Sequence, residues 1–243
     1  MPERSQRVVL VRHTLDPEAL TALGARLCYA GGDVDRLLKT IEEKDQRAFV
    51  ERVMAMGHES VLEHASFTFL VEGVSRVLLA QLTRHRIASF SVQSQRYVSY
   101  AGGFGYIVPP AIRALGSDAE AEYHAQMAQM QAWYEGWQKR LGDAGEKSNE
   151  DARFVLPGAC ETRVLLTMNA RELLHFFSLR MCNRAQWEIR ELAWQMYALV
   201  YPLAPSVFEN AGPGCAHGAC PEGKRSCGKA DEVRRRLEEV KKQ

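Results

Sequence analysis

The sequence lacks a dominant charge of either sign. Its 243 residues include 31 Lys and Arg against 30 Asp and Glu, which leaves a net charge of +1. A chain this close to neutral has no overall electrostatic field that would hold a polyanion, so any site for a phosphate or a nucleic acid must be local.

Long apolar runs are also missing. No segment approaches the roughly 18 apolar residues of a membrane span, and the start leads into only four apolar residues before Arg12 and His13. Such a start does not have the features of a secretory signal peptide. We therefore expect a cytoplasmic protein that does not associate with a membrane.

Cysteine is sparse, with six residues in the chain. Three cysteines are scattered and three crowd one segment near the end: Cys28, Cys160 and Cys182, then Cys215, Cys220 and Cys227. Without a secretory signal, an even count of six is a weak argument for disulfides. We expect free thiols and one local cluster.

The crowded segment also contains a histidine. Cys215, His217, Cys220 and Cys227 lie within 13 residues and offer the number and types of ligands of a tetrahedral zinc site. Their spacing, C-x-H-x2-C-x6-C, is not a standard paired-knuckle pattern, so free thiols or an oxidised pair remain alternatives. We assign no metal-binding residue on this pattern.

What the sequence does contain is an ordinary globular composition, with 46% apolar and 25% charged residues. Alternating and β-branched runs predict strands over residues 8–11, 66–71 and 161–168, and residues 90–97 fit a strand or an extended loop. Apolar residues at helical spacing predict helices, the main ones over residues 17–30, 74–82, 119–141 and 185–201. The pattern indicates one α+β domain over residues 1–205, followed by a Cys- and Gly-rich extension over residues 206–243.

A first polar cluster combines cations with hydroxyl donors. Arg84, His85 and Arg86 stand at the end of a predicted apolar helix, and Ser94 and Arg96 follow ten residues later. A guanidinium group matches two phosphate oxygens and a hydroxyl adds a donor, so the cluster suits a phosphate. Cations at a helix C-terminus are also favoured by the helix dipole, which leaves capping as the alternative.

A second polar cluster lies on a predicted helix. Asn169 and Glu172 have the spacing of an N-cap and its capping-box partner. Arg171 and His175 are four residues apart on one face, and Arg180 lies at the far end. Apolar runs on either side predict a largely buried helix, in which an arginine must meet an anion or a partner. A surface helix with a cap is the alternative.

His58, Glu59, Glu63 and His64 resemble a zinc site only in residue type. The two histidines are six residues apart and so do not share a helical face as ligands four apart do. A structural role or an acid/base role fits this group better.

The run of Arg84-His85-Arg86, seven residues, Ser94, one residue and Arg96 resembles the signature of the flavin-dependent thymidylate synthases. Residues 57–64, 168–171 and 179–188 resemble that family in the same order. The resemblance extends from about residue 8 to residue 201 and does not include the cysteine-bearing tail.

The resemblance implies mixed helices around a central antiparallel sheet, in a homotetramer whose active sites lie at subunit interfaces. It implies the reductive methylation of dUMP to dTMP, with 5,10-methylenetetrahydrofolate as the carbon donor. NADPH would supply the hydride through FAD, and no cysteine would attack the uracil.

The resemblance also implies roles for individual residues. FAD would contact Ser60, Arg84, His85, Arg86, Asn169, Arg171 and His175. The nucleotide dUMP would contact Gln81, Arg84, Val92, Gln93, Ser94, Gln95, Arg96 and Arg163, and the turn over residues 92–96 would cradle its phosphate from a neighbouring subunit. Arg180 would lie at the uracil edge as the catalytic residue, because a fixed guanidinium can stabilise negative charge that develops on the ring.

Two other classes of protein remain open. One is a nucleic-acid-binding module that uses Arg84, Arg86 and Arg96, and the other is a non-catalytic structural subunit of an oligomer. A nucleic-acid-binding module should have a basic face, whereas acidic residues are interspersed throughout this chain. A bound flavin would separate the enzyme from both alternatives.

Overall fold

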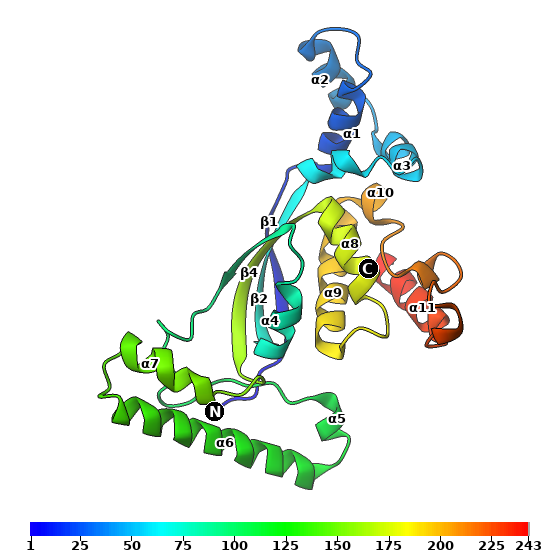
Figure 1. The fold of residues 1–243 in the computed structure, drawn as a ribbon. Helices are drawn as coiled ribbons and strands as arrows, with labels where there is room; N and C mark the ends of the chain where they lie inside the picture. The colour runs from blue at the N-terminus through cyan, green and yellow to red at the C-terminus, as the bar shows by residue number, and fades with distance from the viewer. Residues whose placement is uncertain (243) are drawn as a thin grey trace. The chain divides into compact units, whose positions relative to one another are not determined.

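The computed structural model describes residues 1–242 and is drawn in Figure 1. Its four strands form one sheet in the order β1-β2-β4-β3, with the bounds β1 (Arg7–His13), β2 (Ser66–Ser75), β3 (Ala88–Val92) and β4 (Glu161–Asn169). The sheet is antiparallel with helices around it, so the predicted α+β class is confirmed. Across residues 1–242 no helix has the length and the apolar character needed to cross a membrane.

The chain forms two compact units, and the division between them runs through β2 and β4. The first unit contains residues 1–7, 70–84 and 90–165, and the second contains residues 8–69, 85–89 and the chain from residue 166 onward. Each unit has an apolar core of its own.

The first unit is built on one long helix. Its helices are α4 (Arg76–Leu82), α5 (Pro110–Arg113), α6 (Ser117–Arg140) and α7 (Glu146–Ala152), followed by a 3-10 turn at Arg153–Val155. The long helix α6 confirms the helix predicted over residues 119–141, and it packs Met127 and Tyr134 into the core of this unit. Gln138 on α6 donates to the side-chain oxygen of Asn149 on α7 over 2.6 Å, which joins the two helices.

Strand β2 contains a glycine where a larger residue would not fit. Gly73 has a φ of +67°, and a Cβ atom there would lie 1.9 Å from the carbonyl oxygen of Ser5. The N–H of Gly73 donates to the carboxylate of Glu161 over 3.1 Å. Close approach of the two backbones therefore requires glycine at this position.

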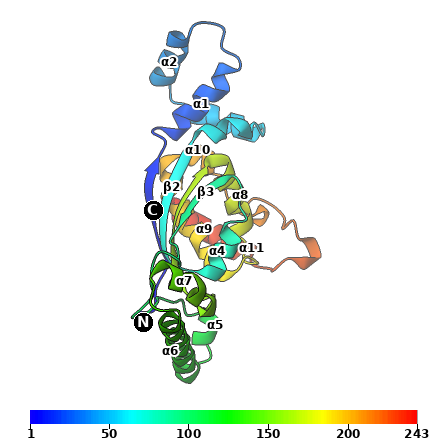
Figure 2. The same ribbon diagram turned by 60° about the vertical axis from the view of Figure 1, so that its left-hand side comes forward.

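The second unit contains most of the helices. They are α1 (Pro17–Leu27), α2 (Val34–Glu43), α3 (Arg47–Ala55), the 3-10 helix η1 (Glu59–His64), α8 (Ala170–Arg180), α9 (Trp187–Val200), α10 (Pro205–Phe208) and α11 (Ala230–Lys241). Helices α8 and α9 lie side by side in Figures 1 and 2. Edge-to-face aromatic contacts form the core, in which Phe177 packs on Tyr197 and Phe208 at centroid distances of 5.6 and 6.0 Å.

The last helix differs from its prediction. The charged sequence after residue 230 predicts an exposed helix or a frayed end, whereas Val233 and Leu237 on α11 are each only 3% exposed. Arg236 donates to both carboxylate oxygens of Glu191 on α9 over 2.9 and 2.8 Å. Two apolar residues four apart give α11 a narrow buried face among many charges, and that face holds the helix on the second unit.

Candidate active site

Helix α8 begins as the sequence predicts. The side-chain oxygen of Asn169 accepts a hydrogen bond from the backbone N–H of Glu172 over 2.8 Å, which satisfies one free donor of the first turn. The carboxylate of Glu172, expected to complete a capping box, instead contacts His85. Asn169 is therefore confirmed as the cap, and Glu172 has a second partner that the local pattern does not predict.

Glu172, His85 and Arg180 form a hydrogen-bonded chain. His85 Nδ1 lies 3.0 Å from Glu172 Oε1, and the Nε of Arg180 donates to His85 Nε2 over 3.1 Å. Because Arg180 Nε can only donate, Nε2 must be the accepting nitrogen and Nδ1 must carry the proton. His85 and Glu172 are buried, at 5% and 7% exposure, so this pairing sets the tautomer of a neutral imidazole.

The protonation of His85 follows from its surroundings. Burial lowers the pKa of His85 below its ordinary value, and the positive charge of Arg180 lowers it further. The hydrogen bond to Glu172 opposes this shift but does not reverse it. A neutral ring that accepts from Arg180 fixes the direction of one guanidinium N–H, so His85 acts here as a positioning residue for Arg180.

A cavity of about 680 Å³ lies along the exposed side of α8. Three of the residues that the family resemblance assigns to FAD line it, namely Asn169, Arg171 and His175. Glu59 and Glu63 of η1 line it as well, and each carboxylate pairs with Arg171, at 3.6 and 2.5 Å. The cavity therefore combines one arginine and three carboxylates, those of Glu59, Glu63 and Glu172, with the apolar side chains of α8 and neighbouring segments.

Sequence reasoning missed part of this cavity. The sequence pattern argues against zinc for the group of Glu59 and Glu63 and favours a structural or acid/base role, but it does not indicate that both carboxylates meet Arg171. Ile87, which is 64% exposed, and Asn210 also line the cavity without a motif that marks them. Ser60 and Arg86 do not line the cavity, and both are exposed.

The turn that follows β3 is organised by its own side chains. The hydroxyl of Ser94 accepts from the backbone N–H groups of Arg96 and Tyr97 over 3.1 and 3.3 Å. Arg76 on α4 donates to the carbonyl of Gln93 over 2.9 Å. The strand ends at Val92, so Ser94 and Arg96 stand on this turn and not on one face of a strand.

The arginines assigned to the nucleotide differ in their pairing. Arg96 lies 2.7 Å from Glu146 and 3.2 Å from Glu150, both on α7. Arg163 lies 3.8 Å from Glu72. Arg84 is exposed and makes no ion pair with any residue of the described chain.

The remaining assigned residues have ordinary environments. Gln81 on α4 is half-buried, in agreement with a polar break in an apolar helix. Val92 is half-buried at the end of β3. Gln95 donates to the sulfur of Cys160 over 3.5 Å, which ties the turn to the core of the first unit.

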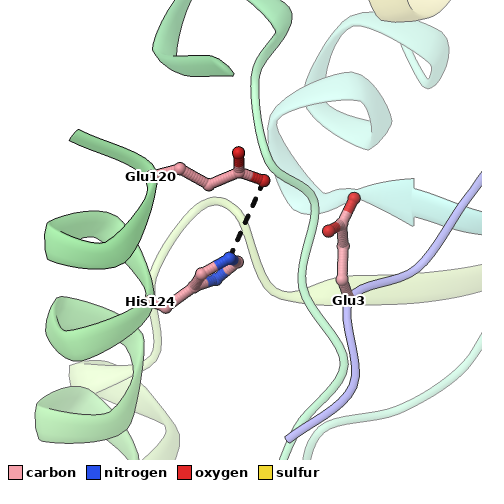
Figure 3. A group of neighbouring side chains, drawn as sticks. All are labelled: Glu3, Glu120 and His124. Carbon is pink, nitrogen blue, oxygen red and sulfur yellow. Dashed lines mark ion pairs between the residues drawn. The ribbon is translucent and has the colours of Figure 1, made fainter. Parts of the chain in front are cut away.

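One group of potential metal ligands comes together in the first unit, drawn in Figure 3. The ligand atoms of Glu3, Glu120 and His124 lie within 4.8 Å of one another. Arg113, however, forms ion pairs with both Glu3 and Glu120, and His124 Nδ1 bonds the hydroxyl of Tyr106 over 2.7 Å. One guanidinium group already pairs with both carboxylates, and His124 has a hydrogen-bond partner, so we interpret this group as an ion-pair network.

Comparison with known proteins gives consistent matches over most of the chain. A protein-family model described as "Thymidylate synthase complementing protein" matches residues 9–206. A flavin-dependent thymidylate synthase of Geobacter sulfurreducens is 52% identical over 235 residues, which cover 96% of this chain and 99% of the relative. One of Clostridium tetani is 45% identical over 239 residues, which cover 94% and 96% of the two chains.

A solved structure also matches. The crystal structure of the UMP/dUMP methylase PolB from Streptomyces cacaoi, bound with 5-Br dUMP, superposes with a TM-score of 0.69 at 28% sequence identity. The match covers 86% of this chain and 97% of the other. It therefore includes both compact units.

Proposed function

The chain belongs to the flavin-dependent thymidylate synthase family, and we propose that it catalyses the reductive methylation of dUMP to dTMP. FAD is the cofactor, with 5,10-methylenetetrahydrofolate as carbon donor and NADPH as reductant. The observation that carries this proposal is the cavity along α8, because it gathers Asn169, Arg171 and His175 at the positions that the resemblance assigns to the flavin.

The residues of this cavity fit a dinucleotide cofactor. Its volume of about 680 Å³ lies within the range of small-molecule sites. Arg171 offers a guanidinium that matches a diphosphate, and its ion pairs with Glu59 and Glu63 involve half-exposed side chains. Exposed ion pairs are weak, so Arg171 can exchange a carboxylate for a diphosphate oxygen. The bound flavin would supply the hydride that NADPH provides.

Arg180 is the proposed catalytic residue at the uracil edge. Its Nε–H is committed to His85, which leaves the guanidinium plane with a fixed orientation. A preorientated cation stabilises negative charge on the uracil ring at the moment it develops, without a cost for reorganisation. His85 and Glu172 support this role from the buried side, because their hydrogen bonds hold the guanidinium in place.

The turn over residues 92–96 is the proposed phosphate site, completed by Gln81, Arg84 and Arg163. The hydroxyl of Ser94 accepts from two backbone N–H groups, which leaves its own O–H to donate to a phosphate, and Arg96 places a cation beside it. The ion pairs of Arg96 with Glu146 and Glu150 are near 40–45% exposed, where such pairs contribute about 0–1 kcal/mol. A phosphate with more charge than either carboxylate can therefore replace them.

We further propose a cytoplasmic homotetramer whose active sites combine residues of different subunits. Large apolar side chains that are more than three-quarters exposed support association, among them Leu15, Tyr29, Leu115 and Phe154. All six cysteines are free in the structure, in agreement with a reducing compartment. Light scattering on the purified protein tests the subunit number.

The test of the activity is direct. The purified protein should bind FAD, should oxidise NADPH faster when dUMP is present, and should form dTMP when methylenetetrahydrofolate is added. A colourless protein that also fails to bind added FAD would refute the proposal. That result would favour a structural subunit or, if the protein shifts a labelled oligonucleotide, a nucleic-acid-binding module.

A further inference from the structure

Four cysteines of the second unit lie on segments that meet at its C-terminal end. Cys182 directly follows the C-cap of α8, Cys215 lies in a 3-10 turn (Gly214–Ala216), and Cys220 and Cys227 stand on either side of a second turn (Gly223–Arg225). Cys182 thus comes from the catalytic region and the other three come from the tail. None of them has a role in the proposed reaction.

Hydrogen bonds from two arginines hold these segments together. Arg184, two residues after Cys182, donates to the carbonyl of Arg225 over 2.8 Å and to Glu222 over 3.4 Å. This contact brings the chain after α8 to the turn between Cys220 and Cys227. From α11, the Nε of Arg234 donates to the carbonyl of Cys215 over 3.2 Å, and its Nη2 donates to Gly218.

The thiols also interact with one another electrostatically. Burial raises the pKa of the Cys215 thiol, and the charges of Cys182, Cys220 and Cys227 raise it further. The placement of the four cysteines near one another rests on the hydrogen bonds that join their segments, from Arg184 to the carbonyl of Arg225 and from Arg234 to the carbonyl of Cys215. Cys215 is 6% exposed at the centre of this group, and Cys227 is exposed at its rim.

We propose that Cys182, Cys215, Cys220 and Cys227 form a four-thiolate centre that binds a thiophilic metal, either one zinc ion or one 4Fe–4S cluster. Four cysteine ligands satisfy either species. His217, which the spacing of the tail offers as a ligand, hydrogen-bonds the carbonyl of Ala211 through Nε2 over 3.1 Å, and four thiolates complete the centre without it. Cys182, which is 33 residues before Cys215 in sequence, takes its place.

The separation of the sulfurs bears on the choice of metal. Zinc–sulfur bonds of about 2.3 Å in a tetrahedron place the sulfurs about 3.8 Å apart. Among the residues described, no three cysteines have sulfurs that all lie within 4.8 Å of one another. A zinc ion would have to draw the thiols closer, whereas a cluster of four irons spans a wider set of ligands, and the elemental analysis below separates the two.

Such a centre would connect the tail to the active site. Cys182 is two residues beyond Arg180, and α8 ends between them. A metal bound by Cys182 and the three tail cysteines would fix the end of α8 covalently to a segment that otherwise depends on hydrogen bonds. The negative charge of four thiolates, unfavourable when they stand together alone, would be offset by the metal.

The experiment uses the full chain purified without chelators and without oxygen. Metal content is measured by elemental analysis together with acid-labile sulfide, because flavin absorption hides an iron–sulfur band. We expect either about one zinc, or about four irons with four sulfides, per chain. Cys182→Ser and Cys220→Ser should each reduce this content by roughly tenfold or more. Cys28→Ser, at an exposed cysteine after α1, should retain it.

Two results would overturn the proposal. One is a protein that contains no stoichiometric metal and takes up none when incubated with zinc, or with ferrous iron and sulfide. The other is full metal content in Cys182→Ser, which would exclude the catalytic-region ligand. Metal content does not depend on bound flavin or on turnover. The metal proposal can therefore be refuted while the protein still forms dTMP, and the enzymatic function can be refuted while the metal is present.

Discussion

Replacing Glu172 with glutamine tests whether the buried hydrogen bonds of Glu172 and His85 position Arg180, the proposed catalytic residue. A carboxylate only accepts hydrogen bonds, so it selects the His85 tautomer with the proton on Nδ1. The amide of Glu172→Gln can donate as well as accept. When it donates to Nδ1, the ring proton moves to Nε2 and faces the N–H of Arg180, which breaks the 3.1 Å hydrogen bond.

The size of the effect is limited by the bond that is lost. A hydrogen bond to a charged group contributes about 1.5–3 kcal/mol, and about 1.36 kcal/mol corresponds to a factor of ten in rate. Complete loss of the contact between Arg180 and His85 would therefore reduce kcat by about 10- to 160-fold. Glu172 is not among the residues assigned to FAD but it lines the same cavity, so the flavin content of the variant is measured beside kcat.

The pH profile distinguishes positioning from a general loss of stability. Protonated His85 carries a proton on Nε2 and cannot accept from Arg180, so activity should fall on the acid side with the pKa of His85. Glu172 raises that pKa against the effect of burial. Removing its charge should therefore move the acid limb of kcat to lower pH.

The assay is dTMP formation at saturating dUMP from pH 5 to 8, normalised to bound flavin, with Glu161→Gln as the matched control. Glu161 is also a buried carboxylate, at 9% exposure, but it accepts from Gly73 and pairs with Arg4 in the first unit. The control should lower stability without moving the acid limb. Near-normal kcat and an unchanged acid limb in Glu172→Gln would refute the positioning role.

Three further predictions concern Arg180, the turn after β3 and the pH dependence of stability. Arg180→Lys should reduce dTMP formation roughly 100- to 1000-fold with folding intact, because a point charge cannot reproduce a planar fork; turnover near normal would remove Arg180 from catalysis. Ser94→Ala and Arg96→Ala should weaken dUMP more than deoxyuridine in binding titrations, whereas equal losses would separate both residues from the phosphate. The free energy of unfolding should fall as pH drops below about 6.5, because the pKa of His85 is lowered in the folded protein and the unfolded chain binds more protons. In denaturant titrations at several pH values, His85→Gln should reduce the dependence of the unfolding free energy on pH.

Local signals in the sequence predicted strands β1, β2 and β4, the main helices and one cap, whereas β3 (Ala88–Val92) begins before the predicted segment 90–97 and ends within it. The strands, the long helix α6 and the helices α8 and α9 follow from apolar periodicity and turn residues, and Asn169 caps α8 as its spacing predicts. These features depend on residues within one turn or one strand, and that is the range over which a sequence pattern carries structural information.

Contacts between distant residues were not predictable in this way. Glu172 lies 87 residues from His85 in sequence, and Arg171 lies 108 residues from Glu63. Each glutamate also had a plausible local interpretation. Glu172 has the spacing of a capping-box partner, and Glu63 belongs to the group that resembles a zinc site only in residue type. Tertiary packing decided their partners, and nothing in the spacing of either residue indicates the other end of the pair.

The partners of the arginines distinguish two proposed roles in the site, ligand binding and stabilisation of charge during the reaction. Arg96 and Arg171 meet carboxylates at half-exposed positions, where solvent screens the pair and a phosphate or diphosphate can replace the partner. Arg180 instead meets a buried neutral imidazole, which cannot be displaced without leaving a buried nitrogen unpaired. Binding arginines must exchange partners each time a ligand enters and leaves, whereas an arginine that stabilises developing charge must already be fixed before the reaction. The hydrogen bonds that run from Glu172 through His85 to Arg180 meet this second requirement before any ligand binds.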